Sequence, residues 1–463
     1  MKKTIIIFLL IPAVLYAQEY NPGLSGKMAV PDDVSLTGLS LDSCKALAMS
    51  NNYRIREAAG EVSQAEQVKK SVFTSYFPKV SAGFSAVRMN DYMVKGSIPQ
   101  MNLPVYDGNP ANLPVATQFA YFPGLELNLV DYMNIGYAMA AQPLFTGGRI
   151  YNGNKLARTG YEISREKKSM TDTEVLVKTE ELYWNIIALN EKLITVDSYR
   201  VLLEKLNQDV SAALKAGLVQ RTDLLKVQLK QNELELNRLK LTDGIALSQM
   251  ALCQHIGITF DSALILADTI TAVSDPATIF VDPEEAVRNR NEYKILLKAV
   301  LAEELQKKIV AGEYLPQVSV GVAGVYTDFM DKSNEFGMAF ATLSVPISGW
   351  WEGTHKIRQS RVKVENASNR LAETSELLSL QIVRAQNDLK QNYFRIHNAE
   401  RSLEQAQENL KVTEDNYDAG ISVMSDLLEA QSVYQDAVNS LTEAKCDYQI
   451  ARARYLQAIN DYK

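Results

Sequence analysis

The chain has 463 residues, of which 46% are hydrophobic and 22% are charged, and its formal net charge is −7. This composition is typical of a folded protein and argues against disorder over most of the chain. A nucleic-acid-binding protein needs a basic surface that displaces counterions from phosphates. An acidic chain without a basic stripe is therefore a poor candidate for that class.

The N-terminus predicts export. Lys2 and Lys3 precede an apolar stretch over 5–15, and Ala17 is followed by polar residues. This pattern is typical of a secretory signal peptide, here residues 1–17. The stretch is too short to span a bilayer, and no later run of about 18 apolar residues predicts a transmembrane helix. Since no Cys follows the cleavage point, we expect simple cleavage rather than a lipid anchor.

The cysteines are three in number and widely separated: Cys44, Cys253 and Cys446. An odd, scattered set in an exported protein does not form a disulfide framework. We expect free, buried thiols.

An internal repeat organises the chain. Tyr-Phe-Pro-Lys-Val at 76–80 recurs 238 residues later as Tyr-Leu-Pro-Gln-Val, and Ala-Gly-Leu at 216–218 recurs 203 residues later as Ala-Gly-Ile. Self-similarity of this kind predicts one structural unit built twice. We expect a first repeat over 18–256, a linker over 257–282 and a second repeat over 283–463.

The change in displacement places 35 extra residues in the first copy. They fall near 90–124, a stretch rich in proline, glycine and asparagine. These residues favour turns, so the sequence predicts a long external loop there.

Each copy is predicted to begin with a helix, over 41–75 and 283–313, the second opened by the cap Asp282 and by Pro283. Two extended segments follow, in which apolar residues alternate with small or polar ones. The alternating positions are Val80, Ala82, Phe84 and Ala86; Ile135, Tyr137, Met139 and Ala141; and Val318, Val320 and Val322. A period of two predicts strands, and it suits a barrel that separates lipid from water.

Very long helices are predicted over 155–216 and 355–419, because apolar residues recur there every seven positions. These positions are Val175, Leu182, Leu189, Val196, Leu203 and Val210, and then Ile382, Leu389, Ile396, Leu403, Leu410 and Tyr417. Sustained heptads indicate coiled-coil packing, and each segment would be about 90 Å long at 1.5 Å per residue. Such a helix is too long for a compact globular domain.

Each long helix ends at a glycine, Gly217 or Gly420, and a return helix follows. In the second copy the return helix has alanine at every seventh position: Ala430, Ala437, Ala444, Ala451 and Ala458. This seam of small side chains lets neighbouring helices approach closely. The prediction is two long antiparallel helical hairpins.

Four strands cannot close a membrane barrel, since the smallest such barrels have about eight. Open edges cannot remain in lipid, because every backbone N–H and C=O there needs a partner. The chain is therefore expected to oligomerise, and three copies would supply twelve strands.

The chain resembles the TolC-like outer-membrane efflux proteins. The resemblance covers nearly the whole mature chain and rests on the duplicated order of helix, strand pair and long hairpin. Its local marks are the Tyr-x-Pro-x-Val motifs at 76–80 and 314–318, Gln-Pro-Leu-Phe-Thr-Gly-Gly at 142–148, and the Ala-Gly-Leu and Ala-Gly-Ile turns that precede Asp223 and Asp426.

The resemblance implies an α+β membrane protein: a homotrimer with a twelve-stranded β-barrel in the outer membrane, continuous with a periplasmic α-helical coiled-coil barrel. It also implies a periplasmic adaptor protein at the tunnel tip and an energised inner-membrane transporter behind it. The chain itself has no Gly-Lys-Ser or Gly-Lys-Thr phosphate loop. No cofactor is expected.

Two other functional classes fit the sequence less well. An enzyme is disfavoured because His255, His355 and His397 are the only histidines and no metal, serine or thiol motif occurs. A periplasmic coiled-coil adaptor or scaffold would share the heptads, but it would be expected to carry one hairpin among small β-rich domains. Fractionation separates these alternatives, since only the channel should need detergent to leave the outer membrane.

The glycine turns are candidate contact sites. By the resemblance, Gly217 with Leu218 and Gly420 with Ile421 lie at the periplasmic tips and meet the adaptor. Glycine followed by an apolar residue is also a common way to end a helix. The two interpretations are compatible.

The acidic pair Asp426 and Glu429 is a candidate pore constriction, with Tyr417 beside it by resemblance. Residues three apart share a helix face, and three chains would bring six carboxylates to the narrow end. The first copy has Asp223 but Lys226, and Ser422 stands where the resemblance implies a basic residue. Asp426 also fits a helix cap, so both roles remain open, and a ring rests more on Glu429.

Overall fold

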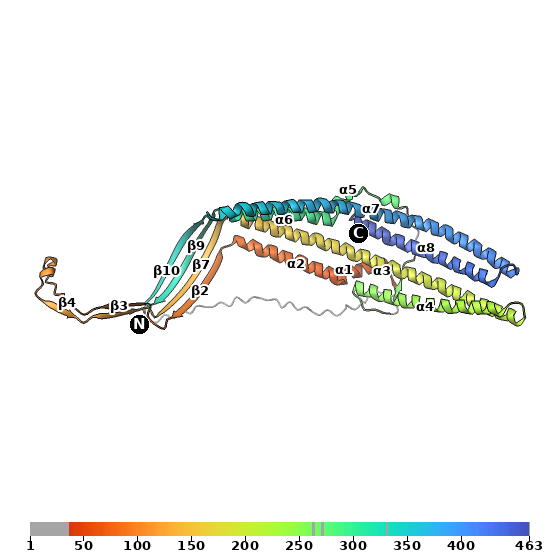
Figure 1. The fold of residues 1–463 in the computed structure, drawn as a ribbon, viewed down its shortest axis with the longest axis horizontal. Helices are drawn as coiled ribbons and strands as arrows, with labels where there is room; N and C mark the ends of the chain where they lie inside the picture. The colour runs from red at the N-terminus through yellow and green to blue at the C-terminus, as the bar shows by residue number, and fades with distance from the viewer. Residues whose placement is uncertain (1–36, 262–263, 270–272, 330–331, 463) are drawn as a thin grey trace. The chain divides into compact units, whose positions relative to one another are not determined.

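The computed structural model describes residues 37–261, 264–269, 273–329 and 332–462, coloured along the chain in Figure 1. The predicted signal peptide lies outside these residues. Two compact units are present. The helical unit comprises the described parts of Met1–Gly60, Lys167–Asn291 and Ser375–Lys463, and the sheet unit comprises those of Glu61–Glu166 and Glu292–Thr374.

The sheet unit contains a four-stranded antiparallel sheet in the order β10-β9-β7-β2. Its strands are β2 (Lys79–Arg88), β7 (Tyr132–Thr146), β9 (Gln317–Phe329) and β10 (Lys332–Ser344). Strands β2 and β7 come from the first copy and β9 and β10 from the second, so the pairing of β7 with β9 joins the two copies. Strands β2 and β10 form the two open edges.

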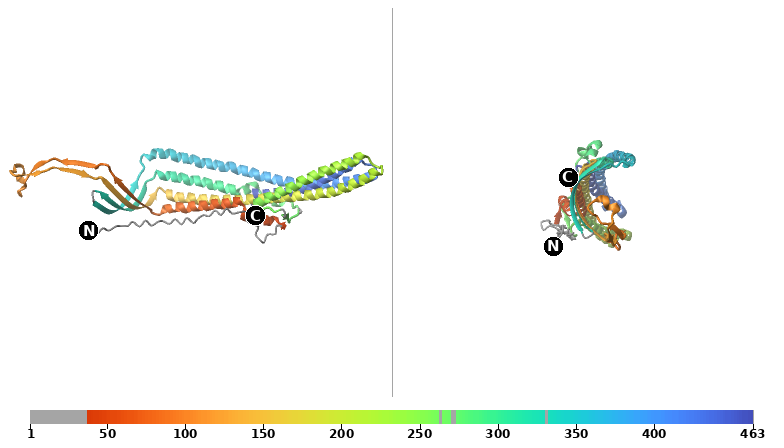
Figure 2. Two further views of the ribbon diagram at one scale, coloured as in Figure 1. Left: turned by 90° about the horizontal axis from the view of Figure 1, so that it is seen from below. Right: turned by 90° about the vertical axis from the view of Figure 1, so that its left-hand side faces the viewer.

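The extra residues of the first copy form a β ribbon between β2 and β7, so the prediction of a loop is wrong. Strand pairs β3 with β6 and β4 with β5 build it, and a short 3₁₀ turn closes its tip. The bounds are β3 Val94–Ile98, β4 Met101–Pro104, η2 Pro110–Val115, β5 Phe119–Phe122 and β6 Leu125–Leu129. Figures 1 and 2 show the ribbon leaving the end of the sheet as a pair of strands.

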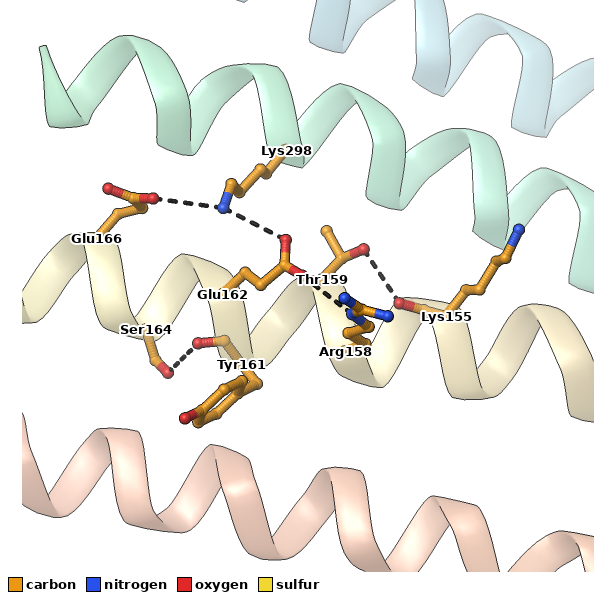
Figure 3. A network of polar contacts seen from close by, with 8 residues as sticks. All are labelled: Lys155, Arg158, Thr159, Tyr161, Glu162, Ser164, Glu166 and Lys298. Carbon is orange, nitrogen blue, oxygen red and sulfur yellow. Dashed lines mark hydrogen bonds and ion pairs between the residues drawn. The ribbon is translucent and has the colours of Figure 1, made fainter. Parts of the chain in front are cut away.

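A long helix adjoins the sheet in each copy, α3 (Arg149–Lys215) and α7 (Gly349–Asp418). In the sheet unit a polar network fastens α6 (Asn291–Glu313) to α3, as Figure 3 shows. The Lys298 Nζ lies 3.3 Å from carboxylate oxygens of both Glu162 and Glu166. Partly exposed ion pairs contribute at most about 1 kcal/mol each, so this bridge sets the axial register of the two helices more than their stability.

The first helix of each copy is broken once, where a single helix was predicted. Helix α1 (Leu41–Asn51) is separated from α2 (Tyr53–Phe73) by Asn52, and α5 (Pro283–Asn289) is separated from α6 by Arg290; both separating residues are extended. These two residues are 238 positions apart, so the break belongs to the repeat. The Asn52 side chain donates to the carbonyl of His255 at 2.8 Å. The short 3₁₀ turns η1 (Thr74–Tyr76) and η3 (Pro276–Ile279) lie in the connecting segments.

The return helices are α4 (Arg221–Ile256) and α8 (Met424–Ala458). Each alanine of the predicted seam in α8 is buried. A buried cluster at the turn end joins heptad residues of α3 to both return helices: Val196, Leu203, Val210, Val227, Leu234, Met424 and Leu428. This is the close packing that the heptads predicted.

The core of the helical unit lies beside a small parallel sheet of β1 (Thr37–Leu39) and β8 (Ile265–Leu266). The Asp268 carboxylate accepts hydrogen bonds from the N–H of Leu41 at 2.9 Å and from the Tyr183 hydroxyl at 2.7 Å. These bonds fix the segment between the two copies against α1 and α3. Cys44, Cys253 and Cys446 all lie in this core as buried thiols that form no disulfide, as expected.

In the described part of the chain, no helix combines the length and the apolar character needed to cross a membrane.

Candidate functional site: the helical tips and the open sheet

The two hairpin turns are built with the same hydrogen bonds. In the first, the N–H of Gly217 donates to the carbonyl of Leu214 and that of Leu218 donates to the carbonyl of Ala213, both at 3.0 Å. In the second, Gly420 and Ile421 make the corresponding bonds, at 3.0 and 2.8 Å. Both glycines have positive φ, +79° and +72°, which side chains rarely adopt. The turns are Schellman motifs, so the helix-terminator interpretation describes their backbone correctly.

The apolar residue after each glycine is not used inside the turn. In a Schellman motif this side chain frequently packs back on the last turn of the helix. Here Leu218 is 79% exposed and Ile421 is 75% exposed. Each tip therefore presents a large apolar side chain to its surroundings, an arrangement suited to contact with a partner.

Asp426 and Glu429 both lie on the exposed surface of α8 just after the second turn. The Asp426 carboxylate accepts a hydrogen bond from the N–H of Val423 at 3.3 Å. Asp426 is the third residue of α8 and reaches back to the N-cap residue Val423, so it stabilises the start of the return helix without being the N-cap that the sequence suggested.

The first copy contributes a lysine beside this acidic pair. Lys226 occupies the position of Glu429 in the repeat, and its Nζ donates to the Ser425 hydroxyl at 2.7 Å. The same ammonium lies 3.8 Å from Asp223. Position 422 is a serine and supplies no positive charge near Asp426. Lys226 of the other hairpin instead bonds to Ser425, the residue next to Asp426. In the sequence Lys226 is only the basic counterpart of Glu429 in the first copy, and nothing there indicates its contact with Ser425.

Tyr417 is half-buried between the two hairpins. It lines a cleft of about 360 Å³ together with Tyr199, Leu203, Asp209 and Glu414, among others. Burial, with the charges of Asp223 and Asp418, raises the pKa of its phenol. Its ring therefore belongs to the packing between hairpins and adjoins the acidic residues of both tips.

The strand register sorts the residues of the sheet onto two faces, because residues paired across antiparallel strands point to the same side. One face, called here the aromatic face, carries Met133, Ile135, Tyr137, Met139, Val325, Phe336, Met338 and Phe340. Its only charged residues are the terminal Lys79 and Lys332. The opposite face carries Arg88, Asp328 and Glu335 near the strand ends that lie away from the helices, and also the apolar Val80, Phe84, Val320, Val322 and Leu343. On this face the Asn134 amide donates to Asp328 at 3.2 Å.

Aromatic rings on the aromatic face cover glycines of the neighbouring strands. A Cβ on Gly83 would lie 2.7 Å from ring atoms of Tyr137, and one on Gly321 would lie 2.5 Å from the ring of Phe340. The rings thus fill the space above glycine, which pins the register of β2 with β7 and of β9 with β10.

Exposed aromatic residues surround the junction between strands and helices. Trp351 is 80% exposed, Tyr151 56% and Phe77 53%. Tryptophan and tyrosine are enriched where membrane proteins cross from lipid to water.

The histidines do not form a chemical centre. The His255 ring lies against the carbonyl of Val175 at 3.1 Å, and His397 contacts Glu400 on the same helix at 3.2 Å. Across the described residues, no three His, Cys, Asp or Glu side chains are grouped so that they could hold a metal ion.

A duplicated pair of strands, each followed by a long helical hairpin with a Schellman tip, defines a subunit of the TolC-type channel fold. Residues 302–461 match the family model described as outer membrane efflux protein. Over this segment the chain matches that family, whose members are channels and not enzymes. The family and fold-class predictions are confirmed.

Solved structures support the fold. The Campylobacter jejuni CmeC outer membrane channel superposes with a TM-score of 0.72 at 14% identity, covering 91% of this chain and 86% of that one. The Vibrio cholerae outer membrane protein VceC gives 0.72 at 14% identity, with 90% and 95% covered. The Neisseria gonorrhoeae MtrE outer membrane channel gives 0.71 at 11% identity, with 94% of each covered.

A curated relative adds a sequence match. The alkaline protease secretion protein AprF of Pseudomonas aeruginosa is 22% identical over 305 residues, which are 63% of this chain. The match spans 62% of the length of AprF.

Proposed function

We propose that three copies of this chain form a passive duct through the outer membrane, which conducts substrates to the exterior. The observation that carries this proposal is the open sheet: four strands end in the unpaired edges β2 and β10, and open edges are not tolerated in lipid. Pairing β10 of one copy with β2 of the next closes a twelve-stranded barrel. In each copy, residues 18–256 and 283–463 supply one strand pair and one hairpin, and 257–282 joins them.

In this barrel the exposed Trp351 and Tyr151, which lie where strands meet long helices, would stand at the periplasmic boundary of the membrane.

The proposed partners are a periplasmic adaptor and an inner-membrane transporter that supplies the energy. The exposed apolar side chains Leu218 and Ile421, each presented by Gly217 or Gly420, form the adaptor-contacting tips. The names of CmeC and MtrE as channels, and of AprF as a secretion protein, support a duct for efflux or secretion.

We further propose that Asp426 and Glu429, with Tyr417 behind them, form the constriction at the periplasmic end. Asp426 already stabilises the start of α8, so the charge available to the duct rests mainly on Glu429. A ring of like charges in a confined mouth concentrates cations and binds polyvalent ones.

The experiment is purification in detergent followed by measurement of mass and conductance. The proposal expects a trimer that forms pores in planar bilayers. A stable, non-conducting monomer would contradict it. Recovery in the soluble or inner-membrane fraction would instead favour the periplasmic adaptor or scaffold.

A further inference from the structure

The β ribbon between β2 and β7 is one ordered structure along its length. Val94 pairs with Leu129 at its base, and Met101 pairs with Phe122 further out. The two ladders keep the same register across the short break between them. At this break, a Cβ on Gly124, whose φ is +80°, would lie 3.0 Å from the carbonyl oxygen of Ile98. The ribbon therefore has a defined backbone geometry and two defined faces.

The base of the ribbon is amphipathic. Every residue on one side of the β3–β6 ladder is apolar or glycine, and this side is called here the apolar ribbon face: Val94, Gly96, Ile98, Leu125, Leu127 and Leu129. Every residue on the other side is polar: Lys95, Ser97, Glu126 and Asn128. A period this strict is typical of a strand pair with water on one side and apolar material on the other.

The apolar ribbon face is uncovered within one chain. Val94 is 50% exposed, Leu125 48% and Ile98 38%. A two-stranded ribbon is marginally stable at best in water, and it needs a third strand or a packed face. Contact with something outside the chain would supply that packing.

Charge argues against a lipid headgroup surface as the covering material. Residues 89–131 contain one lysine, Lys95, and four carboxylates: Asp91, Asp107, Glu126 and Asp131. Phosphate-bearing headgroups attract basic segments and repel acidic ones. A second copy of the chain would not be repelled in this way, because the carboxylates lie off the apolar ribbon face.

Continuity with the open edge of the sheet favours a second copy. The ribbon extends the β2–β7 pair through the hydrogen bond from the N–H of Met89 to the carbonyl of Asp131, at 2.8 Å. Strand β2 is an open edge that the proposed barrel pairs with another copy. Three ribbons would therefore stand at equal height around one axis, with their apolar faces related by symmetry.

We propose that the apolar ribbon face packs against the same face of the ribbons of the other two copies, beyond the end of the barrel. This proposal rests on the proposed trimer and adds an interface that barrel closure does not require. The three ribbons then bury their leucine, isoleucine and valine side chains around the exit, and the polar faces remain in water.

Single cysteines at neighbouring positions test this interface. Ile98→Cys lies on the apolar ribbon face and Ser97→Cys, its matched control, lies on the polar face; Leu125→Cys and Lys95→Cys give a second pair. The native cysteines are buried and can remain. After mild oxidation of intact outer membranes, Ile98→Cys and Leu125→Cys should form disulfide-linked dimers that denaturing gels resolve, and the polar-face variants should not.

Accessibility identifies the other outcomes. If Ile98→Cys stays unlinked and reacts with a membrane-impermeant maleimide as fast as Ser97→Cys, the face is bare and the proposal is wrong. If it stays unlinked and reacts only with a lipid-soluble maleimide, lipid covers the face, which also overturns the proposal. The mass of each unoxidised variant in detergent tells failure of the proposed duct from failure of this interface. A monomer would contradict the duct itself. A trimer whose cysteines stay unlinked would contradict only the packing of the ribbons.

Discussion

Gly147 and Gly312 touch through their backbones. A Cβ on Gly147 would lie 2.3 Å from the carbonyl oxygen of Gly312, and a Cβ on Gly312 would lie 2.4 Å from that of Gly147. Gly147 directly follows strand β7 of the first copy and Gly312 lies near the end of α6 of the second, so this contact joins the copies where strand gives way to helix. The φ of Gly147 is +64°, a backbone conformation that also favours glycine at this position.

Gly147→Ala should lower the melting temperature of the purified protein in detergent. The added methyl overlaps backbone, which cannot move aside as a side chain end can, and overpacking of this kind costs about 1–3 kcal/mol. Gly153→Ala is the matched control, because a Cβ there meets nothing within 4 Å and alanine favours a helix. Equal melting temperatures for the Gly147→Ala variant and the unaltered protein would show that the junction is not close-packed.

His255 should make stability depend on pH. Burial, assisted by the charges of Lys178 and Arg54, holds its pKa below the ordinary value. The folded protein thus binds the proton less readily than the unfolded chain does. The stabilisation from neutral His255 is complete above the unfolded pKa of about 6.5 and is lost as pH falls toward the lower folded pKa.

The measurement is the melting temperature between pH 7.5 and 5. The decrease in melting temperature as pH is lowered should be smaller in His255→Gln than in the unaltered protein. His397→Gln, at an exposed site, should show the same decrease as the unaltered protein. An identical fall in the His255→Gln protein would assign the pH dependence to other groups.

The acidic pair should control ion selection. Single channels of the Asp426→Asn, Glu429→Gln double variant should lose cation preference and block by trivalent cations from the periplasmic side. Because Asp426 accepts a bond from Val423, Glu429→Gln alone should give most of this effect. Asp426→Asn alone keeps an oxygen that can accept this bond, so it should weaken the start of the helix only by the lost charge, about 0.3–1 kcal/mol. Retained block in the double variant would rule out the ring.

The tips should govern docking and leave conduction unaffected. Replacing Leu218 and Ile421 with Asp should abolish efflux from whole cells while the isolated trimer keeps its conductance, since both side chains are exposed and support no packing in the chain. Leu218→Met with Ile421→Met is the control that keeps the apolar surface. Undiminished efflux in the Asp variant would leave these residues only the role of ending a helix.

The helical hairpins were predictable because their signals are long. Heptads sustained over 175–210 and 382–417, glycine at both turns and the repeat itself each indicate the same architecture. The breaks at Asn52 and Arg290 gave no such signal, since neither residue is a strong helix breaker. Their extended conformations belong to tertiary packing, as in the bond from Asn52 to the carbonyl of His255.

The ribbon and the faces of the sheet were less accessible to sequence reasoning. Pro99, Pro123 and Gly124 cluster at one break between two ladders, and their density favoured a loop over a ribbon. Alternation identified the strands but could not relate them to one another. Phe84 and Tyr137 each belong to an apolar alternation, yet the register places them on opposite faces, and only strand pairing decides this.

The contact of Lys226 with Ser425 depends on how two hairpins far apart in sequence pack. Each copy read separately contains no sign of it. Long-range side-chain contacts of this kind are fixed by the mutual placement of helices, which local periodicity does not encode.

The buried thiols can report local unfolding of the core of the helical unit. Burial raises the pKa of Cys44 and Cys446 to about 12, so thiolate is scarce, and the closed core also excludes reagents. Modification by a soluble thiol reagent must therefore wait for a local unfolding event. Its rate, followed on the unaltered chain, measures how often the region around β1 and β8 separates, a quantity that otherwise requires hydrogen exchange.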